Sequence, residues 1–461
     1  MLTTRAHAVR AWEEPRTGWR PPAPSGGLTA SASSGILGLL EMSLLGSAAS
    51  PDLRPADFTP PLAAGGHVGA SRYPEGVAER WLDIGFFAQP QFVFQTGYDF
   101  NSATNFSVPP GVNLQRTRVV VHGQAHPLLQ MRIEFNLSDR LELLDSYALV
   151  PVRRWLQVQI GQFRVPFSRQ ELVSSSRYQF ADRSLWSGAA NSSGVRFIPS
   201  FDLGVMAWGW TGPRDLFEYY VGVFNGKGSN TPFNLDGFFL WAGRLAINPL
   251  GRPSSLQEGA VNLRPAPTLA IALNASTQIR QIGSISRPGS MMPEPNRIGV
   301  TSLGADLFFA AHGFSAYAEV YARDTAETDT TVTQSTQAFG WLAQLGFFIP
   351  HPALRNHLEL IARVQEFDPS TCITRSTAPL SAGGPPDCAT RLPASATREV
   401  YRDFMKTLSM SFGVNWYQLG HGFKLHASYT INNEYRDLAG GVADSGIVLN
   451  DVFTLQLTGS F

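Results

Sequence analysis

From residue 81 onward the sequence repeats one pattern that restricts the fold strongly: short segments in which apolar and polar side chains alternate. Between Leu128 and Leu137, for example, Leu129 and Met131 are separated by Gln130 and followed by a similar alternation. A period of two residues predicts a β-strand with one apolar face and one polar face. About sixteen such segments follow one another, so we expect an all-β protein.

The lack of a long apolar run is a second constraint on the fold. No uninterrupted apolar run in the sequence reaches the roughly 18 residues that a membrane helix needs. A chain that crosses a membrane without such a run must close into a barrel, because lipid offers no partner to an unpaired backbone group. Composition alone leaves a soluble all-β binding module open as well. The balance of 36 basic and 36 acidic residues gives no support to nucleic-acid binding.

The connections between the segments favour the barrel. Long connections, such as 101–111, 278–298 and 368–402, tend to alternate with short ones, such as 124–127 and 311–313. Two connections break the alternation: 138–140 is short and 249–267 is long. Short turns at one end and long loops at the other are typical of outer-membrane barrels with an even number of antiparallel strands. We therefore predict a transmembrane antiparallel β-barrel of about sixteen strands, formed by residues 81–461.

The residues before the barrel have a different composition. Residues 1–49 begin with several arginines and include an apolar stretch from Gly35 to Leu45 and the small residues Ser47 to Ala49, which predicts a signal or targeting segment. Residues 50–80 are rich in proline, glycine and alanine without periodicity. We interpret them as a flexible periplasmic lead-in.

Three runs in the first half of the barrel resemble a known family. Leu144–Tyr147 (LDSY), Val158–Phe167 (VQIGQFRVPF) and Ser168–Leu172 (SRQEL) are similar to the signature of the phosphate-selective porins of Gram-negative outer membranes, the porin O and P type. The resemblance implies an outer-membrane location, a homotrimer of sixteen-stranded barrels, and a third loop that folds inward and narrows the pore. Here that loop is expected at about Val165 to Ser200. The terminal Phe461 looks like the signal that the barrel assembly machinery reads.

The resemblance also implies a function, the passive diffusion of small anions, phosphate foremost, through an arginine-lined pore. Arg116 and Arg118 are two residues apart and project to the same face, which must be the lumen because an arginine in lipid is costly. By the same alternation, or by their place in the expected inward loop, we predict a pore-lining or anion-binding set of Arg116, Arg118, Arg132, Asp145, Arg164, Arg169, Arg177, Arg183, Arg244, Arg323, Arg363 and Lys424. The strand carboxylates Asp145, Asp306, Glu319 and Glu359 are expected to pair with lumen arginines.

The sequence departs from the family at one point, and other functions stay open. The family uses lysines in or near its constriction, whereas the expected third loop has arginines and no lysine. A general-diffusion or carbohydrate-type porin, in which the lumen charges cancel, is therefore the alternative. A barrel enzyme would need a nucleophile beside a base or a pair of acids, and no such cluster can be assembled. We predict no enzyme activity, no cofactor and no metal site.

The sequence has two cysteines, Cys372 and Cys388, on either side of a run rich in proline and glycine. Both lie in one predicted external loop of an exported chain, which favours a disulfide, with two free thiols as the alternative.

Overall fold

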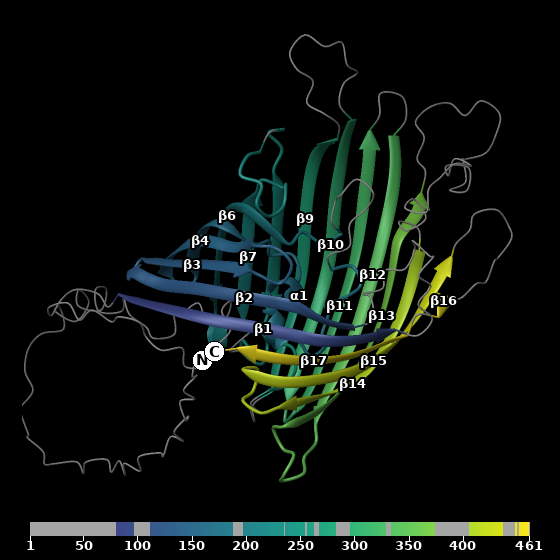
Figure 1. Ribbon diagram of the computed structural model, residues 1–461. Helices are drawn as coiled ribbons and strands as arrows, with labels where there is room; N and C mark the ends of the chain where they lie inside the picture. The colour runs from purple at the N-terminus through teal and green to yellow at the C-terminus, as the bar shows by residue number, and fades with distance from the viewer. Residues whose placement is uncertain are drawn as a thin grey trace, which may run out of the picture. The chain divides into compact units, whose positions relative to one another are not determined.

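The computed structural model describes residues 80–95, 111–187, 197–234, 236–253, 256–261, 267–282, 296–328, 333–373, 405–436, 448–449 and 451–460. Nearly all of these residues belong to one antiparallel sheet that closes on itself (Figure 1). Three short helical pieces accompany it: α1 (Arg169–Leu172), η2 (Ser175–Arg177) and η3 (Pro213–Asp215).

The strands of the first half are β1 (Trp81–Gln95), β2 (Gly111–His126), β3 (Leu129–Asn136), β4 (Glu142–Arg153), β5 (Leu156–Arg164), β6 (Phe201–Thr211), β7 (Phe217–Phe224) and β8 (Leu240–Ile247). Those of the second half are β9 (Thr268–Ile282), β10 (Asn296–Ala311), β11 (Phe314–Thr328), β12 (Thr333–Phe348), β13 (Leu358–Ile373), β14 (Met405–Tyr417), β15 (Phe423–Arg436), β16 (Val448–Leu449) and β17 (Val452–Ser460).

Closure of the sheet makes it a barrel. From β1 to β15 each strand pairs with the next one along the chain, and β17 pairs with both β15 and β1, where Phe92 lies opposite Leu455. The two-residue β16 pairs only with β15 and is the first piece of the strand that continues as β17. The described residues therefore form a closed antiparallel barrel of sixteen strands. This confirms the predicted fold class.

The barrel wall is uneven in height. Strands β3 to β8 contain 8 to 12 residues, whereas β9 to β15 contain 13 to 16. At a rise of about 3.4 Å per residue, the longest strands are about twice as long as the shortest. The green strands of the second half accordingly stand taller in Figure 1.

The outer face of the wall is apolar and the inner face is polar. On β9, Leu273 is 67% exposed while its neighbour Asn274 is 3% exposed, and on β14, Phe412 is 57% exposed while Ser411 is fully buried. Exposed leucine, isoleucine, valine and phenylalanine side chains recur on strands all round the barrel. Soluble proteins rarely expose contiguous apolar patches larger than a few hundred Å². The outer face is therefore suited to lipid rather than to water.

The turns and strand ends differ in detail from the sequence expectations. At the tight turn between β10 and β11, His312 and Gly313 both have positive φ, of 50° and 84°, as the preferred two-residue hairpin turn requires. The first strand begins at Trp81, which pairs with Gln124 of β2, and β2 continues to His126, inside the connection expected at 124–127.

Candidate functional site

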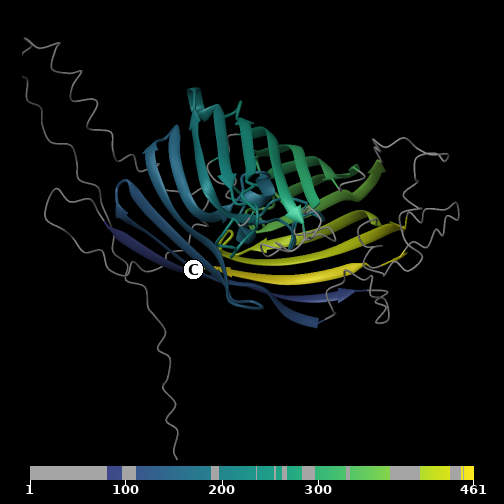
Figure 2. The same ribbon diagram turned by 90° about the horizontal axis from the view of Figure 1, so that it is seen from above.

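The connection between β5 and β6 is residues 165–200, of which 165–187 and 197–200 are described, and the described part leaves the wall and runs through the barrel interior (Figure 2). We call it the inward loop. Ser168 caps α1 at its start by accepting a hydrogen bond from the backbone N–H of Glu171 at 3.2 Å. Every residue from Val165 to Ala181 is buried, except Ser174. The predicted inward fold of this loop is confirmed, at the bounds expected.

Two carboxylates on the longer strands of the barrel wall hold the inward loop. Glu319 of β11 accepts hydrogen bonds from the Ser168 hydroxyl and from the backbone N–H of Gln170, both at 3.1 Å. Glu359 of β13 accepts a hydrogen bond from the Gln179 side chain at 2.6 Å. The expectation that these two carboxylates pair with lumen arginines is wrong, because polar groups of the inward loop occupy them instead.

Apolar packing and two small residues complete the seat of the loop. Phe167 and Trp186 join a buried cluster with side chains of β11, β12 and β13. The wall leaves room for them at glycines of β12. A Cβ atom on Gly340 would lie 2.8 Å from the Trp186 ring, and one on Gly346 would lie 2.0 Å from the amide of Gln179. A larger residue at Gly340 would displace the Trp186 ring, and one at Gly346 would displace the Gln179 amide from its hydrogen bonds.

A second segment also enters the barrel, from the opposite end. It is the connection between β8 and β9, residues 248–267, of which 248–253, 256–261 and 267 are described. We call it the inward turn. Leu256 packs against Leu172 and Tyr178 of the inward loop, and Val261 packs against Phe348 and Tyr417 of the wall. Its unusual length was visible in the sequence, but its position inside the barrel was not predicted.

Glu258 joins the inward turn to the inward loop. This carboxylate is 1% exposed and accepts hydrogen bonds from the side chains of Gln170 at 2.9 Å and Gln344 at 3.1 Å, and from the backbone N–H of Gln179 at 2.9 Å. Its own backbone N–H donates to the carbonyl of Arg177 at 3.1 Å. The two segments therefore form one polar network with the wall, and sequence reasoning assigned Glu258 no role.

Three of the predicted pore-lining arginines are paired with acids of the barrel wall. Their charges are therefore compensated within the wall. The pairs are Arg118 with Glu134 (2.9 Å), Arg132 with Glu134 (2.5 Å) and Asp145 (3.0 Å), and Arg244 with Asp306 (2.5 Å). The predicted pairing of Asp145 and Asp306 with lumen arginines holds.

Two arginines bind the acidic end of α1. Arg183 pairs with the Glu171 carboxylate at 2.8 Å, and Arg164 donates a hydrogen bond to the Glu171 carbonyl at 2.7 Å. Ser187 also donates to the Glu171 carboxylate, at 2.5 Å. Burial disfavours the ionised form of Glu171, but Arg183 and the hydroxyl hydrogen bonds outweigh it and hold the pKa of Glu171 below its usual value.

Arg169 and Arg177 of the inward loop bind the inward turn. Arg169 donates to the carbonyl of Gln257 at 3.2 Å and lies over the Phe308 ring, 4.2 Å from its centre. Arg177 donates to the carbonyl of Leu256 at 3.4 Å. The contacts that hold the inward loop in place therefore include those of Arg164, Arg169, Arg177 and Arg183.

Three cations surround the middle of the inward loop, and their hydrogen bonds go to neutral oxygens. They come from β2, β13 and β15 and converge on loop residues 178–182. Arg116 also donates to the Gln89 side chain at 2.9 Å. The contacts with the loop are Arg116 Nη1 to Ala181 O (3.1 Å), Arg363 Nη1 to Asp182 O (2.9 Å) and Lys424 Nζ to Tyr178 O (2.5 Å). Arg323, the last of the predicted set, donates to the Thr325 hydroxyl at 3.0 Å and lies over the Phe197 ring.

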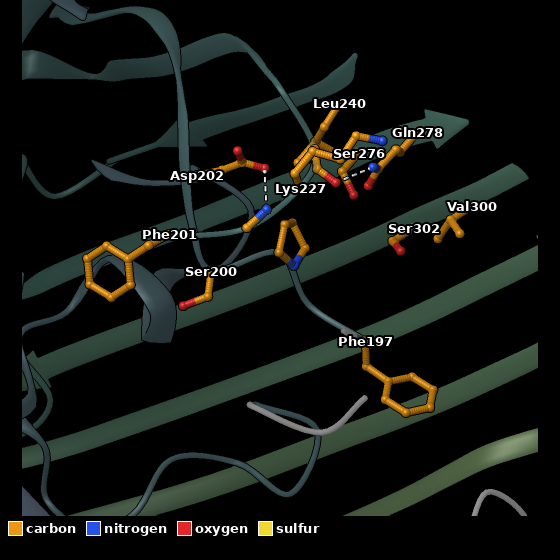
Figure 3. Close-up of a pocket in the computed structure, with 13 residues that line it drawn as sticks. Phe197, Ser200, Phe201, Asp202, Lys227, Leu240, Ser276, Gln278, Val300 and Ser302 are labelled. Atoms are coloured by element: carbon orange, nitrogen blue, oxygen red, sulfur yellow. Dashed lines mark hydrogen bonds between the residues drawn. The ribbon is translucent and has the colours of Figure 1, made fainter. Parts of the chain in front are cut away.

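A small pocket of about 110 Å³ lies where the inward loop returns to the wall (Figure 3). Its lining combines aromatic rings, hydroxyl groups and an amide: Phe197, Phe201, Ser276, Gln278 and Ser302 are among the residues. Lys227 also lines the pocket but pairs with Asp236. Because that pairing compensates the lysine charge, the pocket adds little positive charge to that of Arg116, Arg363 and Lys424, which we call the cationic cluster.

The cysteines are only partly described. Cys372 belongs to the end of β13, opposite Thr336 of β12, rather than to the loop that follows. The strand extends this far because β12 continues to pair with it. Cys388 and the side chain of Cys372 lie outside the described residues, so the disulfide stays a prediction.

Comparison with known proteins places the fold. The sequence matches no protein-family model and no curated protein. Among solved structures, the anion-selective porin of Comamonas acidovorans matches 83% of this chain and 100% of its own, with 10% identity and a TM-score of 0.51. Two further structures are also similar. OprB of Pseudomonas putida matches 83% of this chain and 94% of its own, with 10% identity and a TM-score of 0.48. OmpT of Vibrio cholerae matches 83% of this chain and 98% of its own, with 9% identity and a TM-score of 0.47. The chain therefore has the fold of the outer-membrane porins of Gram-negative bacteria.

Proposed function

We propose that this protein is an outer-membrane porin through which small anions, phosphate foremost, diffuse passively. The observation that carries the proposal is the cluster of Arg116, Arg363 and Lys424. These cations come from three strands, meet at the inward loop and donate to neutral oxygens. Fixed cations in a confined space raise the local concentration of anions, and the acid nearest to this cluster is the exposed Asp182, 3.7 Å from Arg116. The resemblance to phosphate-selective porins and the fold shared with an anion-selective porin agree with it.

Transport through such a pore needs no chemical step. The cationic cluster attracts the anion, and guanidinium and amide N–H groups replace part of its hydration shell. Guanidinium groups suit oxyanions because they donate in a planar fork. Weak sites in series then let the anion leave. In this scheme the protein is a channel and not an enzyme, and it needs no cofactor.

A general-diffusion porin with weak selectivity remains the second candidate, and specific contacts favour it. Arg118, Arg132 and Arg244 are matched by acids in the wall. Lys424 lies within electrostatic reach of Glu359 and Glu258. If these acids cancel the field of the cationic cluster, size alone would decide which solutes pass.

Arg116→Ala should separate the two candidates in a planar bilayer. A unit charge about 4 Å away changes the energy of an ion by about 1 kcal/mol even at the dielectric constant of water, or about fivefold in partitioning. We therefore expect anion partitioning to fall about fivefold at low salt, and anion-over-cation permeability to fall by at least that factor. The effect should shrink in 1 M salt, where the screening length is only about 3 Å. Reversal potentials in chloride and phosphate gradients measure both.

The matched control removes a compensated pair. The double variant Arg118→Ala, Glu134→Ala takes away one charge of each sign and leaves Arg132 paired with Asp145. It should leave the reversal potential near that of the wild type. A wild-type protein without anion preference, or an Arg116→Ala variant with an unchanged reversal potential, would favour the general-diffusion porin.

We further propose that the barrel sits in the outer membrane as a homotrimer, with the short turns in the periplasm. Residues 1–49 serve as the targeting segment in this scheme, residues 50–80 as a periplasmic lead-in, and the terminal Phe461 as the signal for the barrel assembly machinery. We expect the mass of the detergent-purified protein, measured by native mass spectrometry, to equal three chains. A single-chain mass under conditions that preserve other porin trimers would contradict the trimer.

A further inference from the structure

Asp182 stands out within the inward loop. Its side chain is 54% exposed, whereas Ala181 before it is buried and the Arg183 side chain after it is 16% exposed. A carboxylate of the inward loop that keeps this much contact with water is accessible to a solute inside the barrel. It was not among the residues predicted from the sequence.

The surroundings of Asp182 are donors. Its Oδ1 atom accepts a hydrogen bond from the side-chain amide of Gln115 at 2.8 Å and lies 3.7 Å from Nη2 of Arg116. Arg363 donates to the backbone carbonyl of the same residue at 2.9 Å. One amide and two guanidinium groups, from β2 and β13, thus converge on Asp182.

We propose that Asp182 is a specificity-determining residue whose carboxylate competes with the permeating anion for these donors. This inference rests on the proposed anion-pore function. A carboxylate and a small oxyanion such as phosphate have the same recognition chemistry, which is negative charge on oxygen atoms that accept hydrogen bonds. The donors that hold Asp182 are therefore the donors that an entering oxyanion would use.

The geometry suits competition rather than a permanent structural pair. The 3.7 Å separation from Arg116 is longer than a hydrogen bond. About half of the Asp182 side chain is in contact with solvent, so water can replace the donors when the carboxylate leaves them. A channel conducts only when its sites bind weakly enough to release the ion. A tethered carboxylate lowers the affinity of the site in this way.

Asp182→Asn tests the inference, because asparagine keeps the oxygen that accepts from Gln115 and loses the charge. The probe is inorganic phosphate, added to a bilayer that carries a chloride current. Removing a unit negative charge about 4 Å from the site should lower the phosphate concentration that halves the chloride current about fivefold. Anion-over-cation permeability should rise in parallel. Asp182→Glu, which restores the charge, should behave like the wild type.

The control is Asp139→Asn, at an exposed position in the turn between β3 and β4. It removes the same charge outside the constriction and should change neither quantity. An anion-selective wild type with unchanged phosphate block in Asp182→Asn would overturn the inference and leave the proposed function intact. A nonselective wild type made anion-selective by Asp182→Asn would support the inference and reveal a site silenced by its own carboxylate. No selectivity in either protein would overturn both.

Discussion

Replacing Glu258 with alanine should widen the pore and loosen the barrel interior. The variant loses a buried carboxylate that accepts three hydrogen bonds, from Gln170, Gln179 and Gln344. Hydrogen bonds to charged groups contribute roughly 1.5–3 kcal/mol each, so the interactions that hold the inward loop should weaken by about 3 kcal/mol or more. We expect a higher and noisier single-channel conductance, together with a lower thermal unfolding midpoint.

Glu142→Ala is the matched control for this variant. Glu142 lies at the start of β4, one of the shorter strands. It accepts a hydrogen bond at 3.1 Å from Ser229, in the connection between β7 and β8. Its removal should leave the conductance unchanged. If Glu258→Ala folds and conducts like the wild type, then Glu319 and Glu359 alone suffice to hold the inward loop, and the inward turn does not shape the pore.

Leu455→Arg should destabilise the barrel by about 2–4 kcal/mol, the cost of placing an arginine on the lipid face near the middle of a membrane. Leu455 is 44% exposed on the outer face of β17, opposite Phe92 of β1. Denaturant unfolding in lipid vesicles, followed by the heat-dependent mobility of the protein in gels, measures the loss.

Thr430→Arg provides the comparison on the neighbouring strand β15. Thr430 is half-buried and lies on the inner face, where its hydroxyl is 2.9 Å from that of Ser411. An arginine there can extend into the lumen, so the free energy of unfolding should change much less than in Leu455→Arg. Equal losses at the two positions would contradict the assignment of the two faces.

The barrel could be predicted because each strand carries its own evidence. Glu359 and Arg363 alternate with Leu360, and the structure places the first two inside and the third outside. Such alternation reports which solvent each face meets, whatever the neighbouring strands are. The inward loop was predicted from different evidence, the resemblance of the run from Val158 to Leu172 to a known family.

The partners of the charged residues could not be predicted, because they depend on register and on chain segments far apart. Arg118 reaches Glu134 diagonally, since the register places Asn136 opposite Arg118 and Val120 opposite Glu134. The inward turn is polar and rich in proline and glycine, like a solvent-exposed loop. Only contacts with the inward loop and with β12, 79 to 88 residues away in sequence, distinguish Glu258 from a surface acid.

The attachment of the inward loop to distant strands has a consequence for the order of folding. Gln170 binds Glu319, which follows it by 149 residues, and the Gln179 carbonyl accepts from Asn415, which follows it by 236. Contacts this far apart in sequence form slowly, because a long stretch of chain must be ordered before they can be made. The inward loop has no wall to bind until the strands that carry Glu319 and Asn415 are paired in the sheet. We therefore expect the docking of the inward loop to follow the pairing of β11 to β15.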